Sequence, residues 1–139
     1  MQQYTQRWKI ERLHFTLKSG LGIEQLQFDT AEKLAHAIAL LSIVAWRVLW
    51  VTYYARLNPD APAQHMLGAT PLKVLSKASG QSIITATQAS RAIAKLGGYV
   101  GPSGKYKEPG VKSIWRGIQR LQAMTEGWCL AHEKNNLQD

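Results

Sequence analysis

Charged side chains recur on one face of a predicted helix near the start of the sequence. At about 100° per residue, side chains three, four, seven or eleven positions apart share a helix face. Arg7, Glu11, His14 and Lys18 have this spacing, and Tyr4 lies one turn earlier on nearly the same face. The pattern therefore predicts one polar stripe on an otherwise apolar helix.

Two interpretations of this stripe follow from its chemistry. A carboxylate can bind a hard divalent cation, which binds phosphate in turn. Arginine, lysine and a tyrosine hydroxyl can contact phosphate directly. The alternative is a solvated face, on which an Arg7–Glu11 pair contributes about 0.2–0.5 kcal/mol to helix stability. Because Glu11 is a single carboxylate, a two-metal site would need further carboxylates from elsewhere.

Helical periodicity dominates the sequence, and no alternating strand pattern is convincing. The first helix is predicted from about residue 2 to Lys18, where glycines follow. Residues 58–70 are rich in proline and have the composition of a linker. Thr70 is predicted to cap a helix that begins with Pro71. The five predicted helices cover about residues 2–18, 30–56, 71–79, 87–96 and 111–133.

One predicted helix is apolar enough to raise the question of a membrane. Residues 35–55 approach the length of a spanning helix. Arg47 lies well inside this segment, and a central arginine costs about 2.5–3.5 kcal/mol on an insertion scale. We therefore interpret the segment as a buried core helix, and we expect no membrane partner.

Composition favours a polyanionic partner. The 139 residues carry a formal net charge of +8, and 45% of them are apolar, which is enough for a packed core. Cys129 is the only cysteine, so a disulfide within the chain and a cysteine-rich zinc site are excluded. The first residues lack the apolar region of a signal peptide. These features predict a cytoplasmic protein whose partner is nucleic acid or an anionic membrane surface.

The stripe resembles a known signature. Tyr4, Arg7, Glu11 and Lys18 are similar in type and spacing to the Tyr-Arg-Glu-Lys signature of bacterial cut-and-paste DDE transposases, most closely the group that includes the Tn-five enzyme. Further residues of the family pattern are also present: Trp8, Ile10, His14, Gly20 and Glu24. Two later stretches, RAIAKLGGYVG and PGVKSIWRGIQRL, also look similar, so the resemblance covers nearly the whole chain.

The resemblance implies specific roles and a fold. Glu11 would be the last catalytic carboxylate and a ligand of Mg²⁺ or Mn²⁺. Tyr4, Arg7 and Lys18 would bind DNA phosphates at a transposon end, with Trp8 and His14 beside them, although Trp8 could serve packing alone. The fold would be mainly α: residues 1–56 a helical remnant of a ribonuclease-H-like core, and residues 57–139 an all-α dimerisation domain.

The sequence departs from the family in its carboxylates. The two catalytic aspartates of such enzymes lie upstream of the signature, and none of Asp29, Asp60 and Asp139 can be assigned to them. We therefore expect a C-terminal piece of a transposase that binds no metal firmly and has no activity alone. Two alternatives stay open. One is a non-catalytic inhibitor that dimerises with full-length transposase, and the other is a small basic helical protein that binds DNA or membrane.

The last predicted helix carries an apolar stripe with alternating steps of three and four residues. It predicts an interface for a homodimer, or for a heterodimer with full-length transposase, and Gly117 would allow a close helix crossing there. The alternative is that the whole stripe is intramolecular core. The predicted interface residues are Ile114, Trp115, Ile118, Leu121 and Trp128.

Overall fold

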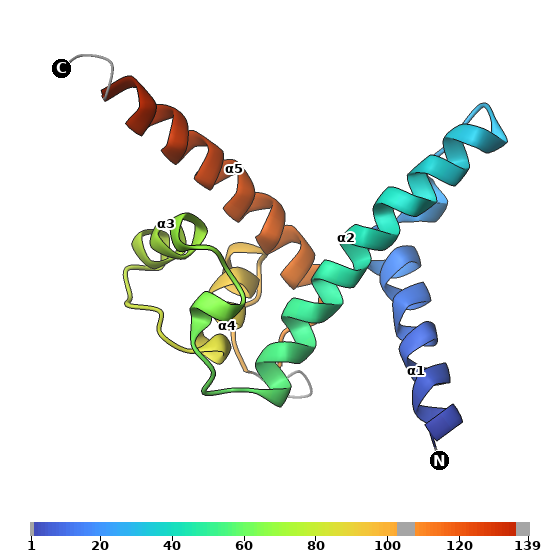
Figure 1. Cartoon of the computed structure of the whole chain (residues 1–139), viewed down its shortest axis with the longest axis horizontal. Helices are drawn as coiled ribbons and strands as arrows, with labels where there is room; N and C mark the ends of the chain where they lie inside the picture. The colour runs from blue at the N-terminus through green and yellow to red at the C-terminus, as the bar shows by residue number, and fades with distance from the viewer. Residues whose placement is uncertain (1, 103–107, 136–139) are drawn as a thin grey trace. The chain divides into compact units, whose positions relative to one another are not determined.

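The chain is mainly α-helical. The computed structural model describes residues 2–102 and 108–135, with side chains for 7–102 and 108–133, and these residues contain no β-strand. The helices are α1 (Gln2–Phe15), η1 (Thr16–Gly20), η2 (Ile23–Gln25), α2 (Ala31–Leu57), η3 (Ala63–His65), α3 (Ala69–Ser79), α4 (Ala86–Leu96) and α5 (Val111–Asn135) (Figure 1). The mainly α fold class is confirmed, while a ribonuclease-H-like origin stays a prediction.

The chain divides into two compact units, residues 1–50 and 51–139, so α2 contributes to both. The division falls inside α2, earlier than the boundary at residue 56 that the sequence suggested. The first unit contains α1, the two short helices η1 and η2, and the first part of α2. The Thr30 hydroxyl accepts a hydrogen bond from the Lys33 backbone N–H at 3.3 Å, which caps the start of α2.

The first part of α2 differs from the predicted buried helix. Ala45 and Val48 are buried, but large apolar side chains around the remaining circumference are exposed: Leu34, Ile38, Leu40, Ile43 and Trp46. Among the described residues, α2 is the one helix long and apolar enough to cross a membrane, and 17% of its most apolar 18-residue stretch is buried. The described part of the chain covers one side of α2 alone, so the prediction of a core helix is not confirmed by these residues and stays a prediction.

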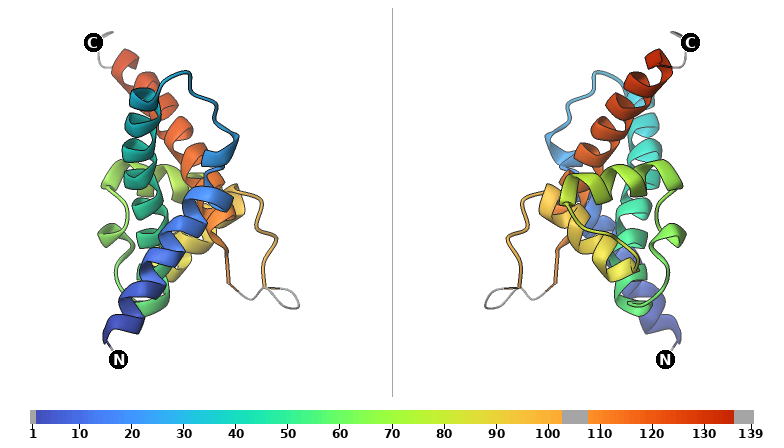
Figure 2. Two further views of the ribbon diagram at one scale, coloured as in Figure 1. Left: turned by 90° about the vertical axis from the view of Figure 1, so that its right-hand side faces the viewer. Right: turned by 90° about the vertical axis from the view of Figure 1, so that its left-hand side faces the viewer.

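In the second unit, α3 and α4 both pack against α5 (Figure 2). Helix α4 begins with a capping box, in which Thr85 Oγ1 accepts from the Gln88 N–H and Gln88 Oε1 accepts from the Thr85 N–H. Helix α3 begins two residues earlier than predicted, and Gly68 is its N-cap. Pro71 fits inside its first turn because the first four N–H groups of a helix have no intrahelical partner.

Residues 58–70 are not a linker. Ala63, Met66 and Leu67 are buried, and the backbone of this segment forms hydrogen bonds with residues just before α4 and in its first turn. The Ala63 N–H donates to the Ile84 carbonyl at 2.7 Å, and the Ala86 N–H donates to the Ala61 carbonyl at 2.7 Å. Proline-rich composition suggested a linker, but these long-range hydrogen bonds fix the segment within the second unit.

Two glycines set the approach of α4 to α5. A Cβ atom added at Gly117 would lie 1.8 Å from the Ile93 carbonyl oxygen, and one added at Gly97 would lie 1.8 Å from the Ser113 carbonyl oxygen. Real Cβ atoms do not come this close to backbone oxygen, so a side chain at either position must push the helices apart. This close approach buries Ile93 and Ile114 completely.

Replacing Gly117 by alanine should therefore destabilise the second unit by roughly 1–3 kcal/mol, the usual cost of overpacking. Gly127→Ala is the matched control, because it lies in the same helix with nothing within 4 Å of the added Cβ. The control should be neutral or stabilising by up to about 1 kcal/mol, from helix propensity. Urea unfolding followed by circular dichroism measures both. Equal effects of the two substitutions would contradict the close-approach account.

Candidate nucleic-acid interface

The centre of the predicted polar stripe lies in solvent on α1. Arg7 Nε is 3.2 Å from Glu11 Oε1, and the two side chains are 79% and 62% exposed. His14 is also exposed on this helix. Tyr4 belongs to α1, but its side chain lies outside the described residues. The structure thus brings Arg7 and Glu11 together on a face that a large polyanion can reach.

Lys18 is positioned differently from the prediction of one continuous α-helix. It lies in η1, a π-helical turn in which the Leu21 N–H donates to the Thr16 carbonyl at 2.8 Å. A π turn holds more residues than an α turn, so each residue rotates less about the axis. Lys18 is therefore displaced from the line of Arg7 and Glu11.

Glu24 is the partner of Lys18. Lys18 Nζ lies 2.7 Å from Glu24 Oε1, and the side chains are 62% and 64% exposed. Gly22, at a φ of 70°, allows the left-handed turn between η1 and the 3₁₀ turn that carries Glu24. The hydrogen bond that Lys18 donates to Glu24, together with the negative charge of Glu24, raises the pKa of Lys18 above the ordinary lysine value.

Trp8 and Thr16 both contact Arg12, which lies next to Glu11 in α1. Trp8 is 41% exposed, so it is not a core residue, and the Arg12 guanidinium carbon lies 5.4 Å from its ring centroid. Thr16 is fully buried, and its hydroxyl donates to the Arg12 carbonyl at 2.9 Å. Such a bond to the carbonyl four residues back loosens and bends a helix, consistent with the π turn that begins there.

Sequence reasoning assigned no role to Arg12 or Glu24. Arg12 follows Trp8 by four residues, a spacing that places two side chains side by side on a helix. That spacing could have indicated the cation–π contact. Glu24 belongs to the resembling pattern, but its contact with Lys18 depends on a π turn and a left-handed glycine that periodicity does not reveal.

The carboxylates do not gather into a metal site within the described part of the chain. No group of three histidine, cysteine, aspartate or glutamate side chains there could hold a metal ion. In the first unit, Asp29 pairs with Lys33 at 3.3 Å, one turn into α2. Asp139 lies outside the described residues. Glu11 could supply one metal ligand, and the remaining ligands would have to come from elsewhere.

The predicted dimer stripe on α5 is divided by the fold. Ile114 and Leu121 are buried within the second unit, and Gly117 meets the backbone of α4. The close crossing that we predicted for Gly117 between two chains thus occurs inside one chain. Trp115, Ile118 and Trp128 keep part of their surface in solvent.

Trp128 carries polar and charged neighbours on its ring. Lys77 Nζ lies 4.4 Å and Lys73 Nζ 5.7 Å from the ring centroid. The His132 ring stacks on Trp128 with centroids 4.1 Å apart. The apolar side chains of Met124, before Trp128 in α5, and of Leu130, after it, are exposed. The outer half of α5 is therefore a mixed apolar and basic surface.

No protein-family model matches the chain. The resemblance to transposases therefore rests on the residues of the signature and on the two later stretches quoted above. The geometry adds an exposed cation–carboxylate face on α1, with a lysine held beside it by a π turn.

The raised pKa of Lys18 gives the first test of this geometry. Glu24→Gln should lower the pKa of Lys18 toward its ordinary value, because the favourable charge and the charged acceptor are lost. Because the folded pKa is raised, the pair stabilises the fold below the unfolded pKa. That stabilisation is lost as pH rises through the folded pKa.

Nuclear magnetic resonance titration of the lysine side chains measures this pKa in both proteins. Asp29→Asn is the matched control, because it removes one carboxylate from the same unit and frees Lys33 instead. A Lys18 pKa that falls as much in the control as in Glu24→Gln would show that the local pair is absent.

Proposed function

We propose that the chain is part of a bacterial cut-and-paste DDE transposase, and that it binds DNA ends through α1 and η1. The observation that carries the proposal is the exposed face of Arg7 and Glu11, followed by Lys18 in the π turn. Exposed ion pairs contribute little to stability, about 0–1 kcal/mol, so this arrangement has little structural purpose. Arginine and lysine at these positions fit phosphate oxygens.

The uncovered part of α2 supports the same proposal. A helix that is apolar all round is normally buried in a larger core or in a membrane. Ile43 and Trp46 are 67% and 60% exposed, which leaves a substantial apolar surface without a neighbour among the described residues. In a transposase, the sheet of a ribonuclease-H-like core would cover it. That polypeptide would also supply the two missing aspartates.

The described residues would perform only part of the chemistry of a transposase. Arg7 and Lys18 would hold phosphates, and Glu11 would contribute one oxygen ligand for Mg²⁺ or Mn²⁺. The described residues do not form the rest of such a site. We therefore propose DNA-end binding and dimerisation for this chain by itself, with cleavage and strand transfer left to the complete enzyme.

Dimerisation would use the outer surface of α5. Trp115, Ile118 and Trp128 are partly accessible there, and Leu130 extends the apolar surface toward the end of the helix. The partner would be a second copy or a full-length transposase. In the second case the chain would act as an inhibitor, because a mixed dimer would hold one incomplete catalytic site.

Membrane binding is the second candidate function, and α2 is the observation that favours it. Its length and apolar surface suit a bilayer. Arg47 weighs against this candidate, because it lies in the middle of the apolar stretch and stacks over Trp50 at 5.1 Å. A protein core that covers most of α2 is the better explanation.

DNA binding by the stripe is tested with a double substitution, Arg7→Ala with Lys18→Ala. Binding of a duplex should weaken, and the slope of log K against log salt should become shallower by about 1.8, since two phosphate contacts are lost. The control is Lys9→Ala with Lys33→Ala, which removes the same charge from the first unit but away from the stripe. Fluorescence anisotropy at several salt concentrations measures both.

Equal loss of affinity in the two double variants would mean that only net charge matters. Unchanged binding in the stripe variant would remove the proposed DNA contact, leaving the stripe as a solvated face.

Dimerisation is tested by light scattering after size exclusion, which should give twice the chain mass of 15.5 kDa. Ile118→Asp and Leu130→Asp should each give a monomer with unchanged helicity. Ile84→Asp, an equivalent change at an exposed apolar residue outside α5, should stay dimeric. A wild-type monomer at high micromolar concentration would contradict the predicted interface.

A further inference from the structure

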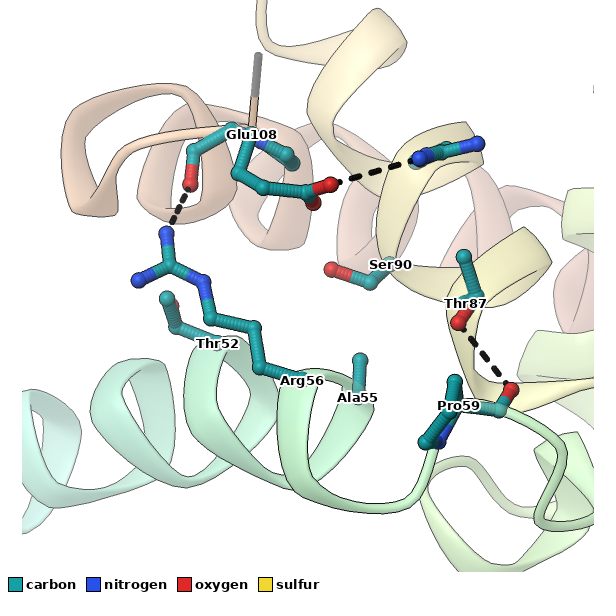
Figure 3. Close-up of a pocket in the computed structure, with 9 residues that line it drawn as sticks. Thr52, Ala55, Arg56, Pro59, Thr87, Ser90 and Glu108 are labelled. Atoms are coloured by element: carbon teal, nitrogen blue, oxygen red, sulfur yellow. Dashed lines mark hydrogen bonds and ion pairs between the residues drawn. The ribbon is translucent and has the colours of Figure 1, made fainter. Parts of the chain in front are cut away.

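A cavity of about 330 Å³ lies within the second unit, apart from the residues of the stripe. It is bounded by the end of α2, by α4 and by the residues that precede α5 (Figure 3). Its lining includes two arginines, one glutamate and three hydroxyl side chains: Thr52, Arg56, Thr87, Ser90, Arg91 and Glu108.

The two arginines are held in place by neighbours that leave most of their donors available. Arg56 Nη2 donates to the Pro109 carbonyl at 2.9 Å, and its guanidinium lies over the Tyr53 ring at 5.4 Å. Arg91 Nη2 lies 3.3 Å from Glu108 Oε1. A guanidinium has five N–H donors, so each of these contacts uses a minority of them. Both cations therefore line the cavity and retain donors that can bind an anion.

Ser90 provides a third donor from the wall. The residue is 5% exposed, and its hydroxyl points into the cavity (Figure 3). Thr87 does not compete for the same role, because its hydroxyl donates to the Pro59 carbonyl at 3.0 Å. Ala55 is also buried, and its small side chain leaves space in the cavity beside Arg56. A small polar ligand can therefore reach Ser90 without displacing a large side chain.

From this arrangement we propose that the cavity binds a phosphate group. Two arginines against one glutamate leave a net positive charge, which selects an anion. Donors from α2 and α4 approach from different sides, which suits four tetrahedral oxygens better than the two coplanar oxygens of a carboxylate. Arginine also matches phosphate with two parallel hydrogen bonds.

Glu108 regulates access to Arg91. The Arg91 and Glu108 side chains are 47% and 48% exposed, so their ion pair is of the weak, solvent-screened kind. An arriving phosphate can take over Arg91 while Glu108 turns to solvent. Glu108→Gln should therefore strengthen phosphate binding, and this sign distinguishes the proposed site from a site in which Glu108 is a ligand-binding group.

The test uses the full chain and inorganic phosphate at constant ionic strength, followed through the arginine Nε–H resonances. Arg56 and Arg91 should shift with saturation, and Ser90→Ala should weaken binding by about tenfold or more, the effect of one hydrogen bond to a charged group. Arg91→Gln should abolish saturation. Arg116→Gln, which removes the same charge outside the cavity, should leave binding unchanged.

A short oligonucleotide with and without a 5′-phosphate distinguishes the source of the group. Competition by the phosphorylated strand alone supports a terminal DNA phosphate, and competition by both strands supports a backbone phosphate. Saturation by inorganic phosphate without competition supports a free anion. Shifts that stay linear for all arginines, or that vanish equally in Arg116→Gln, would overturn the proposal, as would weaker binding in Glu108→Gln. None of these outcomes depends on the stripe of α1.

Discussion

The need to cover helix α2 is the constraint on which the interpretation of this protein depends. Its first part is apolar around most of its circumference, yet the described residues cover one side of it. Exposed Leu, Ile and Trp side chains in such numbers mark a surface that another structure covers. We infer a protein core rather than a bilayer, because Arg47 lies within the apolar stretch and α1 presents charged groups in the same unit.

Within the second unit, the close contact between α4 and α5 is the constraint on which the packing depends. Gly97 and Gly117 each allow the backbone of the other helix to approach, and this contact decides which residues of α5 are core. Ile114 and Leu121 fall on the buried side. The surface left in solvent is therefore narrower than the apolar stripe in the sequence, and it includes Trp115, Ile118 and Trp128.

Local patterns predicted most of the helices. Periodicity located α1, α2, α4 and α5 to within a few residues, because the spacing of apolar side chains along a helix is a local signal. The packing of residues 58–70 was missed, since it depends on hydrogen bonds from Ala63 and Ala86 to residues distant in sequence.

The sequence predicted one ion pair of the candidate site and missed the other. The Arg7–Glu11 pair follows from a spacing of four residues. The Lys18–Glu24 pair does not, because it requires a π turn whose origin includes the Thr16 hydroxyl. Glycine at position 117 was recognised as a point of close approach, but sequence could not tell whether the approaching helix belonged to the same chain. Patterns identify a surface, and only the tertiary contacts show what occupies it.

The central claim, that α1 and η1 contact DNA phosphates, is tested most directly by titrating the labelled chain with a short duplex and following backbone amide resonances. The account predicts the largest shifts between Arg7 and Lys18, with a magnitude that falls steeply as salt rises. Shifts that spare these residues entirely while others respond, at salt concentrations where the duplex is bound, would contradict it.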